Sequence, residues 1–245
     1  MKLHRFYVDS EVELKHDFWL HDERLIHQWR KVLRFQPGQE VVLFDGITHD
    51  RLYRITEFSD KEAHLQHVTD FARKVPAKDV YLLWSLLKKD KNDWILQKCT
   101  ELGVSHFIPL LADRCAKTDI SHNQLERWKK IVIEAAEQCG RSDIPNVREA
   151  LLVDTAIQEL KNGVRLLVCE QTAEQNGGHE KFTFNSQFSI HNSQNAVGVL
   201  IGPEGGWSDN EKELFETMGI KHINLHDFTL RAETASIAAV SQLLK

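Results

Sequence analysis

The sequence predicts an α/β protein in which a small β-barrel with one helix precedes a larger, mostly parallel sheet. Two observations favour this fold class. Short strand patterns separated by turn residues fill residues 1–72, and strand and helix patterns alternate after Lys78. A polar, proline-containing stretch at residues 73–78 separates the two patterns. We therefore expect two domains, at residues 1–72 and 73–245.

The first domain is expected to hold one helix among its strands. This helix begins after the capping residue Asp22 and ends at Pro37-Gly38. Strands are expected at residues 40–44, 51–58 and 65–68, the first two joined through the turn-forming pair Asp45-Gly46. The apolar face of the helix comprises Leu25, Trp29, Val32 and Leu33.

In the second domain, apolar runs predict strands, and the continuous run at residues 80–87 is expected to be buried on both faces of a sheet. The predicted strands cover residues 80–87, 104–110, 164–169, 197–201 and 221–225. Ser121 with Gln124 and Ser208 with Glu211 form capping boxes, and glycines follow the expected helix ends. Helices are expected at residues 92–102, 121–139, 208–219 and 231–244. Three tryptophans within apolar patterns are expected in the core: Trp84, Trp94 and Trp128.

Composition excludes several classes of protein. The chain has 245 residues, 42% hydrophobic and 27% charged, as in ordinary soluble domains. Its net charge of −5 disfavours non-specific coating of nucleic acid but allows local basic patches. The four cysteines lack C-x-x-C spacing, and neither a signal peptide nor a membrane-spanning run is present. We expect a cytoplasmic protein with no metal site and no membrane partner.

The first stretch that could carry chemistry is I-G-P-E-G-G-W-S-D-N-E at residues 201–211. It follows a buried strand and precedes a capped helix, where open α/β sheets bind ligands. Its glycines allow a ligand to approach the backbone. The stretch has neither Walker A nor G-x-G-x-x-G spacing. A purely structural turn remains an alternative interpretation.

The second stretch is L-R-A-E-T-A-S at residues 230–236, where the last helix begins. Unpaired backbone N–H groups at a helix N-terminus can bind polar ligand atoms, and Arg231 and Glu233 lie beside them. The alternative is that Glu233 or Thr234 only caps the helix.

Basic residues form a third feature. Lys88, Lys89 and Lys91 follow the first buried strand, and Arg30, Lys31 and Arg34 lie on the helix of the first domain. Two such clusters on different domains would suit an RNA backbone, although a charged helix face is more often only solvated.

Four segments occur in an order that resembles the ribosomal RNA small subunit methyltransferase E family of the SPOUT superfamily. They are K-K-D-K-N-D-W-I-L-Q-K-C-T-E-L-G-V, A-E-Q-C-G-R-S-D-I-P, I-G-P-E-G-G-W-S-D-N-E and L-R-A-E-T-A. R-F-Y-V and V-L-R-F-Q-P-G near the N-terminus resemble its first domain. The resemblance implies a PUA-like β-barrel, a SPOUT-type sheet with a C-terminal trefoil knot, and a homodimer. It further implies S-adenosylmethionine as cofactor and methylation of N3 of one uridine in 16S rRNA of the small ribosomal subunit, with no DNA partner.

The resemblance also assigns roles to residues. Arg231 and Glu233 are expected to be catalytic. The expected RNA contacts are Arg5, Arg30, Lys31, Arg34, Lys88 and Lys91. The expected cofactor contacts, together with the loop after Cys169, are Leu200, Ile201, Gly202, Glu204, Gly205, Leu225, Leu230 and Thr234.

The chain departs from the family pattern just before L-R-A-E-T-A. His226 stands where the family has glycine, and Phe228 stands where it has a basic residue. The alternative function is therefore a non-catalytic RNA- or ribosome-binding protein on the same scaffold.

Overall fold

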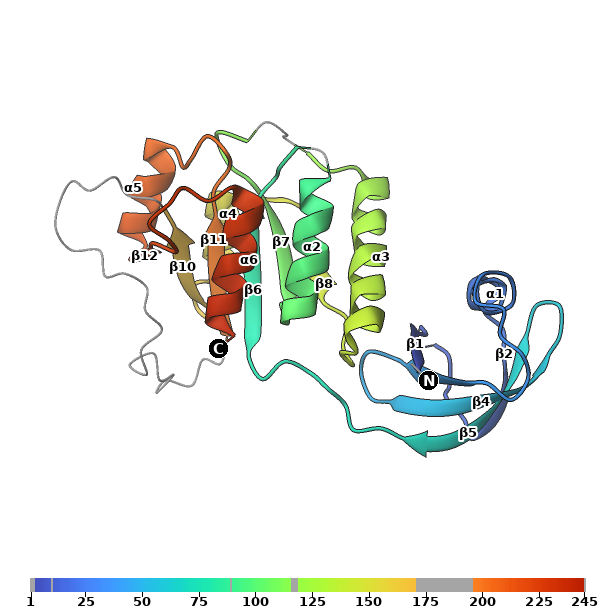
Figure 1. The fold of residues 1–245 in the computed structure, drawn as a ribbon. Coiled ribbons are helices and arrows are strands. Elements are labelled where there is room, and N and C mark those ends of the chain that lie inside the picture. Colours follow the sequence, from blue (N-terminus) through green and yellow to red (C-terminus); the bar gives the residue numbers. More distant parts are fainter. Residues whose placement is uncertain (1–2, 10, 89, 116–118, 171–195, 245) are drawn as a thin grey trace. The chain divides into compact units, whose positions relative to one another are not determined.

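The chain forms two compact units, each described separately below (Figure 1). The computed structural model describes residues 3–9, 11–88, 90–115, 119–170 and 196–244. The first unit comprises Met1–Val75 and Ala136–Ile144, and the second comprises Pro76–Ala135 and Pro145–Lys245.

The N-terminal unit is built on a five-stranded sheet in the order β1-β3-β4-β5-β2. β1 runs parallel to β3, and the other pairs are antiparallel. The helical segment between β2 and β3 packs Trp29 into the core against Phe6, with ring centroids 5.3 Å apart. The elements are β1 His4–Tyr7, β2 Asp17–Leu20, α1 Glu23–His27, the π-helical turn η1 Gln28–Val32, β3 Glu40–Phe44, β4 Asp50–Phe58 and β5 Ala63–Asp70.

The helix of this unit begins as predicted, since Asp22 accepts a hydrogen bond from the Leu25 N–H at 3.0 Å. The prediction of its apolar face was wrong for one residue, because Val32 is 66% exposed. The π-helical turn widens the spiral, with the Leu33 N–H donating to Gln28 O, and so rotates Val32 away from the core. Arg34, with φ of 56°, follows directly in the left-handed region, so the helix ends before Pro37.

Residues 136–144 are held in this unit by a buried carboxylate. Asp50 accepts hydrogen bonds from Arg5 Nη2 at 2.9 Å and from Ser142 Oγ at 2.7 Å. The Tyr7 N–H donates to Glu137 Oε1 at 2.9 Å. Arg5 is thus engaged by a structural ion pair inside the unit.

The C-terminal unit contains a parallel sheet in the order β12-β10-β11-β6-β7-β8, with β9 also paired to β7. The predicted α/β fold class is therefore confirmed. Its strands are β6 Asp79–Ser85, β7 His106–Leu111, β8 Asn146–Val147, β9 Leu151–Leu152, β10 Arg165–Cys169, β11 Ala196–Ile201 and β12 Lys221–Ile223. The helices are α2 Lys91–Leu102, α3 His122–Cys139, α4 Val153–Leu160, α5 Asp209–Thr217 and α6 Ala232–Leu243.

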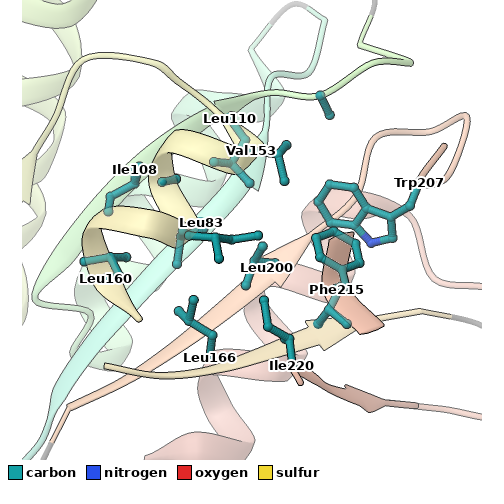
Figure 2. Packing of buried hydrophobic residues seen from close by; sticks show 14 of the residues in the cluster. Leu83, Ile108, Leu110, Val153, Leu160, Leu166, Leu200, Trp207, Phe215 and Ile220 are labelled. Carbon is teal, nitrogen blue, oxygen red and sulfur yellow. The ribbon is translucent and has the colours of Figure 1, made fainter. Parts of the chain in front are cut away.

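Helices cover both faces of this sheet. α6 packs on α2, β6 and β11, while α4 contacts β7 and α5 (Figure 1). Adjacent residues of β6 serve the two faces: Leu83 packs in the cluster of α4 and α5, and Trp84 meets Trp128 of α3. In that cluster the Trp207 and Phe215 rings meet edge to face, with centroids 5.0 Å apart (Figure 2).

Trp84 and Trp128 are buried as expected, but Trp94 is 51% exposed on α2, with Lys98 Nζ 5.2 Å from its ring centroid. The apolar pattern around Trp94 did not distinguish the buried from the exposed side of α2.

The predicted knot depends on the path between β10 and β11, where residues 171–195 lie outside the described part, so the knot stays a prediction.

Asn92 fixes the connection from β6 to α2. Its side chain is buried, accepts hydrogen bonds from Trp84 Nε1 and the Leu87 N–H, and donates to Leu87 O. Asn92→Ala should therefore leave three buried polar groups without a partner and lower the free energy of unfolding by about 3 kcal/mol. Urea unfolding followed by tryptophan fluorescence measures this. Asn123→Ala, at an exposed position of α3, is the matched control and should change little; equal effects would contradict the assignment.

Candidate functional site

A cavity of about 560 Å³ opens where β10, β11 and β12 end, beside the start of α6. Parallel strands deliver their carboxyl ends to one edge of a sheet, so segments far apart in sequence converge there. The lining comes from the ends of these three strands, the glycine-rich segment after β11, the loop before α6, and Arg114 after β7.

The glycine-rich segment is anchored by Glu211. This nearly buried carboxylate accepts hydrogen bonds from the Ser208 N–H at 2.7 Å and the Asp113 N–H at 3.0 Å. Ser208 Oγ in turn accepts from the Glu211 N–H and donates to Asp113 Oδ2 at 2.5 Å. The predicted capping box is thus confirmed, and it also ties the loop to the end of β7.

The Trp207 side chain joins the same segment to the end of β10. Its Nε1 donates to Cys169 O at 3.2 Å. A Cβ atom at Gly202 would stand 3.1 Å from the indole, and Gly206 has φ of +70°. The glycines are required by close approach at the first position and by a left-handed conformation at the second.

Lys91 connects the segment to α6. Its Nζ lies 3.0 Å from Glu204 Oε1 and 3.7 Å from Glu233 Oε2. Burial raises the pKa of Glu204, but the hydrogen bonds from Lys91 and from its own backbone N–H, together with the charges of Lys91 and Lys88, hold that pKa below its ordinary value. Glu233 Oε2 is buried and has no hydrogen-bond partner among the described residues, so Lys91 supplies its nearest compensating charge.

Most residues expected at a cofactor do meet at this cavity. Those in the lining are Ile201, Gly202, Glu204, Gly205, Leu225 and Leu230, and Arg231, which was expected to be catalytic, lines the cavity too. Three other residues expected to bind the cofactor or to be catalytic, all within the described part of the chain, lie outside the lining. Leu200 is fully buried in the core, Thr234 is exposed on α6, and Glu233 faces Lys91. Neither Glu233 nor Thr234 caps α6, whose N-cap is Arg231.

The residues expected to contact RNA divide into exposed side chains and side chains engaged by other described residues. Lys31, Arg34 and Lys88 are exposed. Arg30 donates to Ser59 O at 2.7 Å and lies half-buried against Phe58. Arg5 and Lys91 are held in the ion pairs described above.

Arg114 was not among the residues expected at the site, whereas Glu170 begins the loop after Cys169 that was expected at the cofactor. Residues 171–195 of that loop lie outside the described part of the chain. Arg114 Nη1 donates to Gly205 O at 3.1 Å, and Glu170 binds both His222 Nδ1 at 3.0 Å and Lys212 Nζ at 2.5 Å. His226 and Phe228 also line the cavity. Arg114 follows the end of β7, and this position is the signal that could have pointed to it.

The chain matches two protein-family models and is similar to curated proteins of known family. The family model described as RNA methyltransferase domain matches residues 73–244, and the one described as RNA methyltransferase PUA domain matches residues 30–66. Ribosomal RNA small subunit methyltransferase E of Aquifex aeolicus is 31% identical over 220 residues, covering 87% of this chain and 89% of that protein. Its Rickettsia conorii counterpart is 27% identical over 244 residues, covering 99% and 96%.

The chain belongs to the ribosomal RNA small subunit methyltransferase E family.

Solved structures of the methyltransferase E family agree with this membership. The enzyme of Neisseria gonorrhoeae, crystallised with S-adenosylmethionine, superimposes with a TM-score of 0.84 at 26% identity, covering 98% of this chain and 96% of that one. Within the described residues, no group of three or more His, Cys, Asp or Glu side chains is arranged to hold a metal ion. None of the described helices is both long and apolar enough to cross a membrane.

The anchoring role of Glu211 can be measured. In Glu211→Gln, one of two N–H donors would face an amide NH₂ and lose its acceptor, at a cost of about 2 kcal/mol. We expect Tm to fall by about 5 °C in differential scanning calorimetry. Glu213→Gln, exposed on the same helix, is the control and should leave Tm unchanged. An unchanged Tm in Glu211→Gln would show that the loop does not depend on this carboxylate.

Proposed function

We infer that this protein is an S-adenosylmethionine-dependent methyltransferase acting on 16S rRNA of the small ribosomal subunit, and that its target is N3 of one uridine. Family membership carries the inference. The cavity supports it, because its lining combines two of the segments that resemble the family. In keeping with an rRNA substrate, we place the protein in the cytoplasm.

The cavity fits S-adenosylmethionine in size and chemistry. Its volume lies within the range of small-molecule sites. The glycine-rich backbone at Gly202 and Gly205 offers polar groups at close approach, and Ile201, Leu225 and Leu230 offer apolar surface for a flat ring. The bound cofactor would supply an electrophilic methyl group.

The chain's own residues must manage the charge of the uracil. Methylation at N3 requires loss of the N3 proton, and negative charge then develops on the neighbouring oxygens. Arg231 is an exposed cation in the cavity lining, so it is suited to stabilise that charge. We assign to Glu233 the placing of Lys91 and the start of α6, since it faces Lys91 rather than the cavity.

The RNA would reach the site as an unpaired nucleotide, because N3 lies on the pairing edge of uracil. Of the residues expected to contact RNA, Lys31 and Arg34 in the N-terminal unit and Lys88 in the C-terminal unit are exposed and therefore available for phosphates. A homodimer and the trefoil knot are part of this proposal through the family resemblance. The non-catalytic alternative is not favoured, since the chain keeps Arg231 and an open cavity.

Lys91 was expected to contact RNA, and its ion pairs suggest a different role. Because it joins Glu204 of the glycine-rich segment to Glu233 of α6, we assign it to positioning the two sides of the cavity.

Calorimetric titration with S-adenosylmethionine and methyl transfer to unmethylated small subunits test the function together. Wild-type protein should bind one cofactor per chain and transfer methyl to N3 of one uridine, as shown by nucleoside mass spectrometry. Cofactor binding without transfer, and without RNA affinity, would contradict the proposal.

Arg231→Ala should reduce turnover roughly 100-fold or more, the effect typical of removing one charge-stabilising donor. Cofactor affinity, measured by calorimetry, should change far less. Arg24→Ala removes an exposed cation in the N-terminal unit and is the charge-matched control. Turnover near the wild-type value in Arg231→Ala would remove Arg231 from the mechanism.

Lys91→Met and Lys88→Met should have opposite signatures. Lys91→Met should weaken cofactor affinity about 5-fold, as expected for losing a partly exposed ion pair, with Lys91→Arg retaining affinity. Lys88→Met should leave cofactor affinity unchanged and lower RNA affinity, with a shallower salt dependence. Weaker RNA binding in Lys91→Met, with unaltered cofactor binding, would restore the original assignment.

A further inference from the structure

Of the large apolar side chains in the described part of the chain, Phe228 is the most exposed, at 74%. It lines the mouth of the cavity together with Arg231 and His226. The Phe228 and His226 rings are stacked, with centroids 5.2 Å apart and planes 29° from parallel. An aromatic surface is therefore open to solvent at the entrance of the candidate active site.

The pair is held by the loop rather than by chance packing. The Phe228 N–H donates to His226 Nδ1 at 3.0 Å, and the His226 N–H donates to Asn224 Oδ1 at 3.2 Å. Because Nδ1 accepts, the ring proton of neutral His226 is on Nε2, which can donate to a ligand. His226 does not have a positive φ, so the loop accommodates a side chain at this position without strain.

We propose that Phe228, backed by His226, is a stacking platform for an unpaired nucleobase of the RNA substrate at the mouth of the cavity. This inference rests on the proposed function, because that function requires an unpaired uridine to enter here. The base on the platform is either the reacting uracil or its immediate neighbour in the strand.

Three observations favour a nucleobase as the occupant. Stacking on an exposed aromatic ring is the common way in which proteins hold single-stranded bases, and it needs no hydrogen-bond readout. Arg231 lines the same cavity and supplies positive charge there, which suits a base attached to a phosphate backbone. The platform sits at the entrance, whereas the glycine-rich backbone assigned to the cofactor lies against Trp207 of the core.

The test compares four variants in two binding assays. Phe228→Ala removes the ring, Phe228→Leu keeps apolar area without a π face, and Phe228→Trp restores an aromatic face. Leu152→Ala, at an exposed apolar position on β9, is the control. Affinity for unmethylated 16S rRNA is measured by filter binding, and affinity for S-adenosylmethionine by calorimetry.

We expect Phe228→Ala and Phe228→Leu to bind the RNA about 10-fold more weakly, with Phe228→Trp and Leu152→Ala near wild type. Cofactor affinity should stay within twofold in all four. RNA affinity that survives in Phe228→Leu would overturn the stacking role. Loss of cofactor affinity in both Phe228→Ala and Phe228→Leu would assign the ring to the cofactor's adenine and overturn the proposal.

A second copy of the chain is the alternative partner of Phe228 that the two binding assays do not test. Light scattering after size exclusion should give Phe228→Ala the wild-type mass, and a loss of mass would place Phe228 in a subunit interface instead. Failure of the proposed function itself is separable, because it appears as wild-type protein that neither binds S-adenosylmethionine nor transfers methyl. The platform is judged on the RNA arms alone.

Discussion

The site depends on one carboxylate, that of Glu211, more than on any residue of the cavity wall. Two backbone N–H groups, from Ser208 and Asp113, converge on its oxygens, and a buried carboxylate without such donors would be very costly. Its hydrogen bonds complete the capping box of α5 and join the end of the glycine-rich segment to Asp113, which follows β7. The segment can therefore present bare backbone to a ligand, because the carboxylate that accepts these hydrogen bonds lies outside the cavity lining.

The sequence predicted what local rules decide. The cap at Asp22, the box at Ser208 and the left-handed Gly103 after α2 are short-range signals, and each is found where expected. α4 escaped notice because it begins straight after β9, with no side-chain hydrogen bond at its N-cap. Val32 was misplaced for a different reason: a period of 3.6 residues cannot anticipate a π-helical turn.

The candidate site was predictable in its location but only partly in its chemistry. Glycines after a buried strand mark a ligand edge, and most of the cofactor residues named from the family pattern do line the cavity. Charge is harder to interpret, since a basic residue in a sequence does not reveal its partner. Lys91 and Arg5 are both engaged by carboxylates contributed from distant segments, and these pairings exist only in three dimensions.

The N-terminal unit is made of two separate stretches of the chain, which has a consequence for its folding during synthesis. Asp50 needs the hydroxyl of Ser142, and Tyr7 needs the carboxylate of Glu137, yet more than half of the chain must be made before both partners exist. Domains usually fold in the order in which they are translated. Here the hydrogen bonds to Ser142 and Glu137 can form only once residues 136–144 have been made, so this unit gains its full set of contacts after synthesis of the C-terminal unit has begun.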